Sequence, residues 1–220
     1  MTKPRVLEKN LKILGRTYAD AYDRMQATLR EKGWLETDDL IVSGIVSGFA
    51  LEVGSGPGYL GLEWLQGTRD THLVGLDISP IMVALAKNHA RELKLSDRSR
   101  YVIGSAEAIP FERTTFDSVF TSRSLHEWIN PHTIFTELWR VLKPGGRLYV
   151  SDLRRDLPRS ACNFLSRRVK NEVIIEHLRA SIDAAYTVAD VKDLLKMTEL
   201  VGCAVIETSL GLRVTGIKPV

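Results

Sequence analysis

The chain has 220 residues, a formal net charge of +3, 44% hydrophobic residues and 26% charged residues. This balance is typical of one folded domain with a substantial core, and it argues against a disordered chain. The net charge is too small to indicate nucleic-acid binding, and no basic stretch is interleaved with aromatic residues. The longest uncharged stretch, residues 40–51, is too short for a membrane span and is interrupted by glycines.

The cysteines and the N-terminal sequence bear on the cellular compartment. Cys162 and Cys203 lie far apart and form no metal-ligand motif, which favours a reducing environment and predicts no metal site. Residues 1–10 lack the apolar segment of a signal peptide. We therefore expect a cytoplasmic protein with no membrane or nucleic-acid partner.

Helical and strand-like segments alternate along the chain. Residues 8–46 are rich in helix formers, with a stop expected near Gly33. Further helices are expected at 59–66, 80–93, 131–142, 159–185 and 188–201, and strands at 49–53, 73–76, 100–103, 116–121, 147–151, 204–209 and 212–217. This order predicts a doubly wound α/β fold with a mostly parallel seven-stranded sheet, helices on both faces and a C-terminal antiparallel hairpin. Within one domain we expect a helical cap at 1–47, a core at 48–153, a helical insertion or lid at 156–187, and a helix plus the closing hairpin at 188–220.

Residues 51–59, Leu-Glu-Val-Gly-Ser-Gly-Pro-Gly-Tyr, predict a strand, a tight glycine turn and a helix start. Glycine tolerates positive φ and lets a ligand approach, and the helix adds free N–H groups. Residues 56–61 fit the dinucleotide pattern G-x-G-x-x-G, which alone is a weak signal. Residues 52–58 also fit E-x-G-x-G-x-G, in which Glu52 would attract a cationic or hydroxyl-bearing group. A glycine turn without a ligand is the third interpretation.

Ligands of such sheets bind at the carboxyl ends of the strands, near the topological switch point. Strand-end residues are therefore the site candidates. They are Glu52, Asp77, Ser105 to Glu107, Ser122 to His126, and Asp152.

Five segments in order resemble the class I S-adenosylmethionine (SAM) methyltransferases. They are residues 51–58, 74–79 (Val-Gly-Leu-Asp-Ile-Ser), 104–111 (Gly-Ser-Ala-Glu-Ala-Ile-Pro-Phe), 116–120 with 124–126, and 138–148 (Leu-Trp-Arg-Val-Leu-Lys-Pro-Gly-Gly-Arg-Leu). The resemblance covers residues 48–153 strongly and the final hairpin weakly. The small-molecule subgroup, including the quinone-type C-methyltransferases, is the most similar.

The resemblance implies SAM as cofactor, S-adenosylhomocysteine (SAH) as product, and a role for each motif residue. Asp77 would accept hydrogen bonds from the ribose hydroxyls, because a carboxylate serves two donors, although a helix-capping role is the alternative. Glu52 would act on the ammonium group. Many family members carry Asp where Ser105 stands, so the contact to the adenine amine is weakened here. The cofactor-binding candidates are Glu52, Gly54, Ser55, Gly56, Gly58, Asp77, Ile78, Met82, Ser105, Ala106, Glu107, Ser122, Tyr18 and Tyr22; for Met82 a core role is equally compatible.

Residues after the fourth strand should lie near the transferred methyl group. His126 is a candidate general base, because an unperturbed imidazole has a pKa near 6.5; a positioning or structural histidine is the alternative. Asp152, Arg154 and Arg155 follow the fifth strand, where they either meet the substrate or form an exposed polar loop.

Two segments outside the core would select the substrate. Tyr18 and Tyr22 share a helix face, and Tyr22 with Asp23 resembles the cap element that closes over SAM in the quinone-type subgroup; ordinary amphipathic packing is the alternative. Residues 154–179 contain seven basic and three acidic residues. A basic lid favours an anionic acceptor, although such charges also simply solvate a helix.

The leading hypothesis is a SAM-dependent methyltransferase acting on a small-molecule acceptor. The alternatives are a non-catalytic SAM-binding or scaffold protein and an NAD-dependent oxidoreductase. Glu52 inside the first strand and the closing hairpin fit the oxidoreductase poorly.

Overall fold

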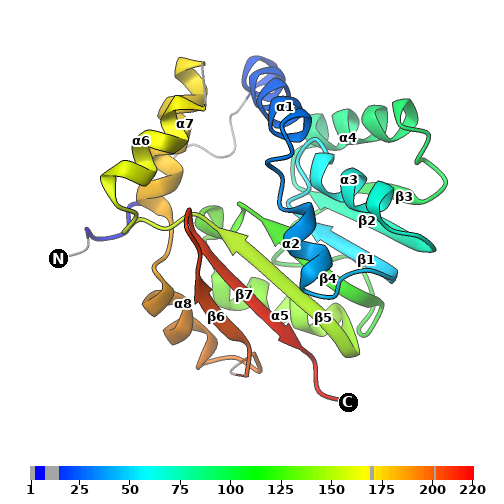
Figure 1. Ribbon diagram of the computed structural model, residues 1–220. Helices are drawn as coiled ribbons and strands as arrows, with labels where there is room; N and C mark the ends of the chain where they lie inside the picture. The colour runs from blue at the N-terminus through cyan, green and yellow to red at the C-terminus, as the bar shows by residue number, and fades with distance from the viewer. Residues whose placement is uncertain (1–2, 8–14, 169–170, 201) are drawn as a thin grey trace.

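A single mixed sheet organises the protein, and the computed structural model describes residues 3–7, 15–168, 171–200 and 202–220 (Figure 1). The strands are β1 (Gly48–Val53), β2 (Thr71–Asp77), β3 (Ser99–Ile103), β4 (Phe116–Ser122), β5 (Leu142–Asp152), β6 (Ala204–Glu207) and β7 (Leu212–Ile217). The helices are α1 (Arg16–Glu31), α2 (Thr37–Val42), α3 (Tyr59–Gly67), α4 (Pro80–Glu92), α5 (Pro131–Val141), α6 (Arg159–Arg167), α7 (Glu172–Ala184) and α8 (Val188–Leu195), with a 3₁₀ turn η2 (Leu125–Glu127).

The strand order is β3-β2-β1-β4-β5-β7-β6, which is the expected seven-stranded sheet. The pairs from β3 to β5 are parallel, and β7 runs antiparallel to both β5 and β6. The order reverses between β1 and β4, so the carboxyl ends of these two strands flank the switch point. The predicted doubly wound fold with a C-terminal antiparallel hairpin is confirmed.

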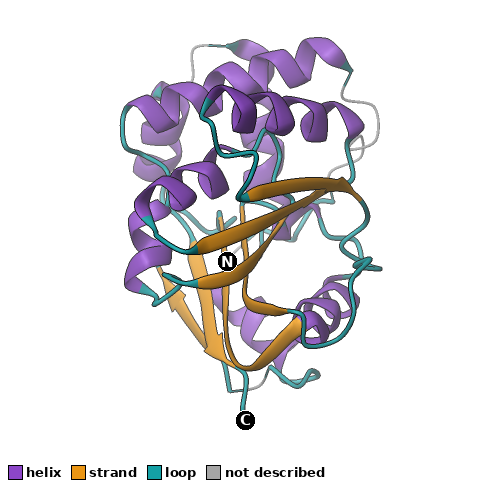
Figure 2. Ribbon diagram, turned by 90° about the vertical axis from the view of Figure 1, so that its right-hand side faces the viewer, coloured by secondary structure: helices purple, strands orange, loops and turns teal. Residues whose placement is uncertain are grey.

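Two apolar layers cover the sheet, because alternate residues of a strand face opposite sides. In β1, Ala50 packs with residues of α2, α3 and α4, whereas Leu51 and Val53 pack with residues of α5 and α8. Trp64 of α3 is fully buried, and its Nε1 donates to the Ile45 carbonyl over 2.7 Å. Figure 2 shows further helices lying across one end of the sheet.

Short local signals define the helix ends around the glycine turn. Gly58 precedes α3 with φ of 84°, a conformation that side chains rarely adopt. Ser79 caps α4 by accepting a hydrogen bond from the Met82 N–H, and Pro80 occupies the first helical position. The sequence predicted this second cap.

The structure differs from the expected boundaries in the middle and C-terminal parts. The predicted helix at 159–185 is two helices, because Asn171 caps a new helix by accepting from the N–H groups of Val173 and Ile174. Residues 143–146 do not form a separate turn. They bulge out of β5, which pairs with β4 at Leu142 and again from Arg147.

The N-terminal segment expected to be helical, residues 8–46, contains α1 and the short α2, and its residues 8–14 lie outside the described part. Residues 3–7 are not helical, and the assignment of residues 1–47 as a cap stays a prediction. No helix among the described residues is both long and apolar enough to cross a membrane.

The packing of α3 against β1 generates a test at Gly61. An added Cβ would lie 2.3 Å from Glu52 Oε2 and 2.4 Å from Leu73 Cδ2. Ala in a helix interior is normally about 1 kcal/mol more favourable than Gly. Here overpacking should outweigh that gain, so we expect Gly61→Ala to lower the free energy of unfolding by about 1–3 kcal/mol in chemical denaturation.

Gly67→Ala is the matched control on the same helix. Its added Cβ would lie 3.4 Å from Ile41 Cδ1, close to ordinary contact. We expect this variant to stay within about 0.5 kcal/mol of the parent protein. A Gly61→Ala protein as stable as the parent would contradict the tight approach of α3 to the Glu52 carboxylate.

Candidate functional site

The glycine turn between β1 and α3 has the left-handed backbone expected of its sequence. Gly54 and Gly56 have φ of 68° and 52°. The N–H groups of Gly54 and Ser55 donate to the Leu76 carbonyl over 2.8 and 3.1 Å, which ties the turn to β2. An added Cβ on Gly54 would lie 2.2 Å from Ser124 Oγ, so this position has no room for a side chain.

A first cavity opens beside this turn, with an empty volume of about 520 Å³ including its open mouth. Its lining joins the carboxyl ends of β1 and β4 with α1 and the α1–α2 connection. The residues are Tyr22, Gln26, Leu29, Trp34, Leu35, Glu36, Glu52, Gly54, Ser55, Gly56, Pro57, Tyr59, Leu60, Ser122 and Arg123. The cavity thus brings together six of the predicted cofactor residues from three separate segments.

Glu52 is a buried carboxyl group on the wall of the first cavity. It is 3% exposed, and among the described residues its Oε2 has no hydrogen-bond partner. Burial raises the pKa of Glu52 to about 8, the nearby Gly61 amide opposes this rise, and the negative charge of Asp77 adds to it. A buried carboxyl of this kind gains free energy when a cationic ligand group reaches it.

Asp77 lies at the end of β2, where its carboxylate connects the glycine turn to α4. Its Oδ2 accepts from the Gly56 N–H over 2.7 Å, and its Oδ1 accepts from the Ser79 N–H over 2.8 Å. Burial raises the pKa of Asp77, while these two N–H groups lower it. Each oxygen retains acceptor capacity for a ligand hydroxyl.

The other predicted nucleoside contacts lie at neighbouring strand ends but outside the residues that line the first cavity. Ile78 is 66% exposed, and its contact with the nucleoside stays a prediction. Ser105 Oγ accepts from the Glu107 N–H, and the Glu107 carboxylate accepts from Asn130. Ala106 packs against the core cluster beneath α5.

Met82, Tyr18 and Tyr22 meet in one cluster between α1, α4 and α7. The rings of Tyr18 and Tyr22 stack with centroids 5.8 Å apart. Tyr22 lines the cavity, whereas Tyr18 is buried behind it, edge-on to the His177 ring at 4.9 Å. The packing alternative therefore holds for Tyr18, and the role of Tyr22 as part of a cap over the cofactor stays a prediction.

Glu36 is a site residue that the sequence analysis missed. It precedes α2 and reaches the ends of β4 and β5, where its Oε2 accepts from Ser122 Oγ at 3.1 Å, from Tyr149 Oη at 3.3 Å and from Ser151 Oγ. Three hydroxyl donors satisfy this side chain, which places a second carboxyl group beside the first cavity. No sequence motif surrounds Glu36. Its place in the site follows only from its contacts with the ends of β4 and β5, which the sequence does not reveal.

A second cavity, with an empty volume of about 740 Å³ including its mouth, adjoins the first. The two share Tyr22, Gln26, Leu29, Trp34 and Arg123. Half of the remaining lining residues are apolar, and the set comes from α1, α6, α7 and the loops after β4 and β5. Those residues are Met25, His126, Glu127, Leu153, Leu165, Arg168, Ile174, His177, Leu178 and Ser181.

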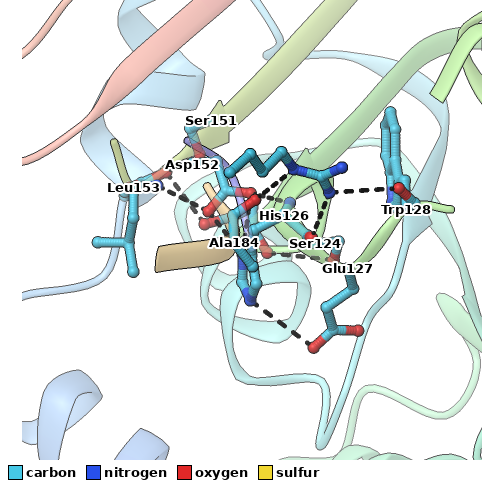
Figure 3. A network of polar contacts seen from close by, with 11 residues as sticks. Ser124, His126, Glu127, Trp128, Ser151, Asp152, Leu153 and Ala184 are labelled. Atoms are coloured by element: carbon cyan, nitrogen blue, oxygen red, sulfur yellow. Dashed lines mark hydrogen bonds and ion pairs between the residues drawn. The ribbon is translucent and has the colours of Figure 1, made fainter. Parts of the chain in front are cut away.

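His126 and Asp152 form a buried pair at the wall of the second cavity (Figure 3). His126 Nδ1 lies 2.9 and 3.0 Å from the two Asp152 oxygens, and the backbone N–H of His126 also donates to Oδ2 over 2.6 Å. Because a carboxylate only accepts, Nδ1 carries the hydrogen and Nε2 carries the lone pair of the neutral ring. Glu127 Oε1 lies 3.9 Å from Nε2.

Asp152 and the two arginines that follow it contact different groups. Arg154 is 5% exposed and pairs with Asp156 at 2.8 Å and Glu207 at 2.5 Å. Arg155 pairs with Asp190 of α8. The expectation of an exposed polar loop is wrong for these arginines, because Arg154 is buried, Arg155 is half-buried and both form ion pairs, whereas a substrate contact stays a prediction.

Arg123 and Arg168 line the cavities, and both lie in segments that the sequence singled out, the strand-end residues 122–126 and the basic segment 154–179, although neither had been given a role of its own. Arg123 follows β4 with φ of 56°, an unusual conformation for a side-chain-bearing residue, and lines both cavities. The Arg168 guanidinium lies 3.8 Å from the Trp34 ring centroid and 3.9 Å from that of Phe164.

Among the described residues, no group of three or more His, Cys, Asp or Glu side chains could hold a metal ion.

Comparison with known proteins gives one family match, a methyltransferase domain, over residues 51–150. The chain is similar to the ubiquinone/menaquinone biosynthesis C-methyltransferase UbiE of Geobacter sulfurreducens, with 31% identity over 73% of this chain and 64% of that protein. It is also similar to the erythromycin 3''-O-methyltransferase of Saccharopolyspora erythraea, with 34% identity over 47% of this chain and 34% of that protein. The chain thus spans less than two thirds of the length of these curated relatives.

Solved structures show the same fold at low sequence identity. A protein of Methanococcus maripaludis described as an S-adenosyl-L-methionine-dependent methyltransferase superposes with a TM-score of 0.73, 22% identity and 98% coverage of both chains. The plantazolicin methyltransferase BpumL in complex with SAH superposes with a TM-score of 0.72, 14% identity, and coverage of 93% of this chain and 91% of that one.

The buried Glu52 carboxyl generates a prediction about stability and pH. Its pKa rises from an ordinary 4.5 to about 8 on folding, so the folded state holds this proton more tightly than the unfolded chain does. The contribution of this proton binding to the free energy of unfolding is therefore fully present below pH 4.5 and is lost as pH rises toward 8. We expect Glu52→Gln to remove this loss, so that at pH 8 the variant is more stable than the parent by about 1.4 kcal/mol for each pKa unit of the shift.

Denaturant unfolding at pH 5, 6.5 and 8 measures this effect without ligand. Glu92→Gln, at an exposed position of α4, is the charge-matched control and should follow the parent profile. Parallel profiles for the parent and Glu52→Gln would show that Glu52 titrates normally in the folded protein.

Proposed function

We propose that this chain, whose residues 51–150 are a methyltransferase domain of the class I SAM-dependent family, methylates a hydroxyl group of a small molecule. The observation that carries the proposal is the buried His126–Asp152 pair on a cavity that adjoins the cofactor cavity. A hydroxyl acceptor must lose a proton on methylation, and the pair could receive that proton. Methylation of a carbon, nitrogen or sulfur atom instead would contradict the proposal. The similarity to a protein named erythromycin 3''-O-methyltransferase is consistent with it.

The first cavity fits the methionine part of SAM. Glu52 supplies the buried carboxyl that an ammonium group would satisfy, and Gly54 and Gly56 leave backbone exposed for close approach. Arg123 is the one cationic residue in the described lining, so we assign it to the cofactor carboxylate. Asp77 would hold the ribose hydroxyls, with Ile78, Ser105 and Ala106 around the adenine.

The cofactor supplies an already activated methyl group, so the chain needs only to align the acceptor, exclude water and move one proton. Asp152 holds the imidazole of His126 in the tautomer with Nδ1 protonated. Nε2 then accepts the hydroxyl proton, and the Asp152 carboxylate stabilises the resulting imidazolium. His177 stays neutral beside it, because burial, with His126 as a further cause, lowers the pKa of His177 to about 4.

The second cavity favours an acceptor that is mostly apolar and carries an anionic group. Leu153, Leu165 and Leu178 contribute apolar walls. Arg168, held between two aromatic rings, keeps its guanidinium edge for a carboxylate or phosphate. Among the described lining residues, Arg123 and Arg168 are two cationic groups against one carboxylate, Glu127.

A turnover screen tests the function. SAH release from SAM is measured with phenols, sugars and hydroxy acids, each in neutral and carboxylate-bearing forms, and calorimetry measures binding of SAM, SAH and NAD. We expect His126→Ala to lower kcat on the best hydroxyl acceptor by about 10²- to 10⁴-fold, the usual contribution of a general base, with SAH affinity nearly unchanged.

His132→Ala, at an exposed histidine of α5, is the matched control and should retain full activity. Methylation of carbon or nitrogen acceptors only, or an unchanged rate for His126→Ala, would refute the hydroxyl chemistry. Binding of NAD without SAH would refute the methyltransferase function as a whole, and SAH binding without any turnover would favour a scaffold.

The assignment of Asp77 predicts a loss of cofactor affinity. Asp77→Ala removes the ribose acceptors and should weaken SAH binding by at least about 1–3 kcal/mol in calorimetry. Ser79→Ala removes only the cap on Met82 and should leave SAH affinity within about twofold of the parent, because that cap contributes to the helix alone. Equal affinities for the parent and Asp77→Ala would rule out the ribose role.

A further inference from the structure

The N-terminal residues 3–7 lie against the loop that carries His126, far from the cofactor motifs in sequence. Arg5 makes the main contacts. Its Nε donates to the Ala184 carbonyl over 2.6 Å, and its Nη2 donates to the His126 carbonyl over 2.9 Å, with a longer contact of 3.5 Å to the Trp128 carbonyl. One guanidinium therefore joins three backbone acceptors.

These acceptors belong to the two elements that shape the second cavity. The His126 and Trp128 carbonyls lie in and just after η2 (Figure 3). Ala184 is the last residue of α7, the helix that supplies Ile174, His177, Leu178 and Ser181 to the cavity lining. Carbonyls at the end of a helix or turn have no partner within it, so an arginine with a rigid fork of donors suits them.

Further contacts hold Arg5 in this position. Its guanidinium lies 4.0 Å from the centroid of the Tyr186 ring. The Val6 N–H donates to the Asp183 carbonyl over 3.0 Å, and Arg155 Nε donates to the Lys3 carbonyl over 3.0 Å. Burial lowers the pKa of Arg5 from 12.5, and the group stays charged at any physiological pH.

We propose that Arg5 is a positioning residue for His126, because its guanidinium fixes the loop that carries the imidazole against the C-terminal end of α7. The His126 imidazole then keeps a fixed position relative to the α7 residues that line the second cavity. The His126 loop and the end of α7 are far apart in sequence, and the Arg5 guanidinium links them directly through hydrogen bonds to both. The proposal rests on the base role of His126 given above, but its test measures the hydrogen exchange of the loop and the titration of the imidazole, not the activity.

The charge of Arg5 supplies a second readout. Among the described residues, the titratable groups near the His126 ring include Asp152 of β5, Glu127 of η2 and His177 of α7. Arg5 lies behind the loop, and its own charged or titratable neighbours include Arg155, Tyr186 and Asp190. A neighbouring cation disfavours imidazolium. Loss of that cation should therefore raise the pH midpoint of His126, whereas Lys at the same position should preserve it.

The experiment uses SAH-bound protein in four forms: parent, Arg5→Ala, Arg5→Lys, and Arg91→Ala as an exposed arginine control on α4. Hydrogen exchange reports on amides of residues 124–128 and 181–186. NMR of ¹³C-labelled histidine follows the His126 titration, which the His126→Ala spectrum assigns among the five histidines.

For Arg5→Ala we expect exchange at least about tenfold faster in both segments, equivalent to about 1.4 kcal/mol of opening free energy. We also expect a His126 midpoint about half a pH unit higher. Arg5→Lys should show faster exchange in both segments with the parent midpoint, because it keeps the charge but lacks the fork. Arg91→Ala should match the parent in both measurements.

Parent-like exchange in both segments for Arg5→Ala would overturn the proposal. If that variant fails to fold or to bind SAH, Arg5→Lys decides, and unchanged exchange there overturns it equally. A hydroxyl acceptor that is never found would refute the proposed chemistry while leaving these readouts intact, so the two failures are distinguishable.

Discussion

The parallel pairing of β2, β1, β4 and β5 sets the positions of the candidate site residues. Parallel strands end at the same edge of a sheet, so the residues that follow them are brought together whatever their distance in sequence. Glu52, Asp77, Ser122 and Asp152 reach this edge as the last or nearly last residues of their strands. Helices α1, α6 and α7 add the walls that turn an edge into two adjoining cavities.

Polar groups buried at this edge are satisfied to different degrees, and the differences suggest what each one does. Glu36 has three hydroxyl donors, and Asp152 has two backbone N–H groups as well as an imidazole. Glu52 keeps an oxygen without a described partner and a raised pKa, which is unfavourable for folding alone. Strain of this kind is characteristic of functional sites, and a cationic ligand group relieves it.

Much of the framework could be predicted because its signals are local. The bounds of β7 and the Ser79-Pro80 start of α4 agree with the prediction. The break before α7 was missed because a helical composition hid the Asn171 cap. The candidate site was predicted where a motif spans a strand end, as at Glu52, and was missed where a residue such as Glu36 acts through distant strands.

Local sequence is enough to define the glycine turn, the helix starts and the alternation of strands and helices, because each depends on the backbone preferences of neighbouring residues. Local sequence also places His126 and Asp152 at strand ends. The pairing of these two side chains across 26 residues, and the contact of Arg5 with a carbonyl 179 residues away, depend instead on how the elements pack in three dimensions. Such contacts follow from strand order and helix packing, which fix the distance between segments that share no local interaction.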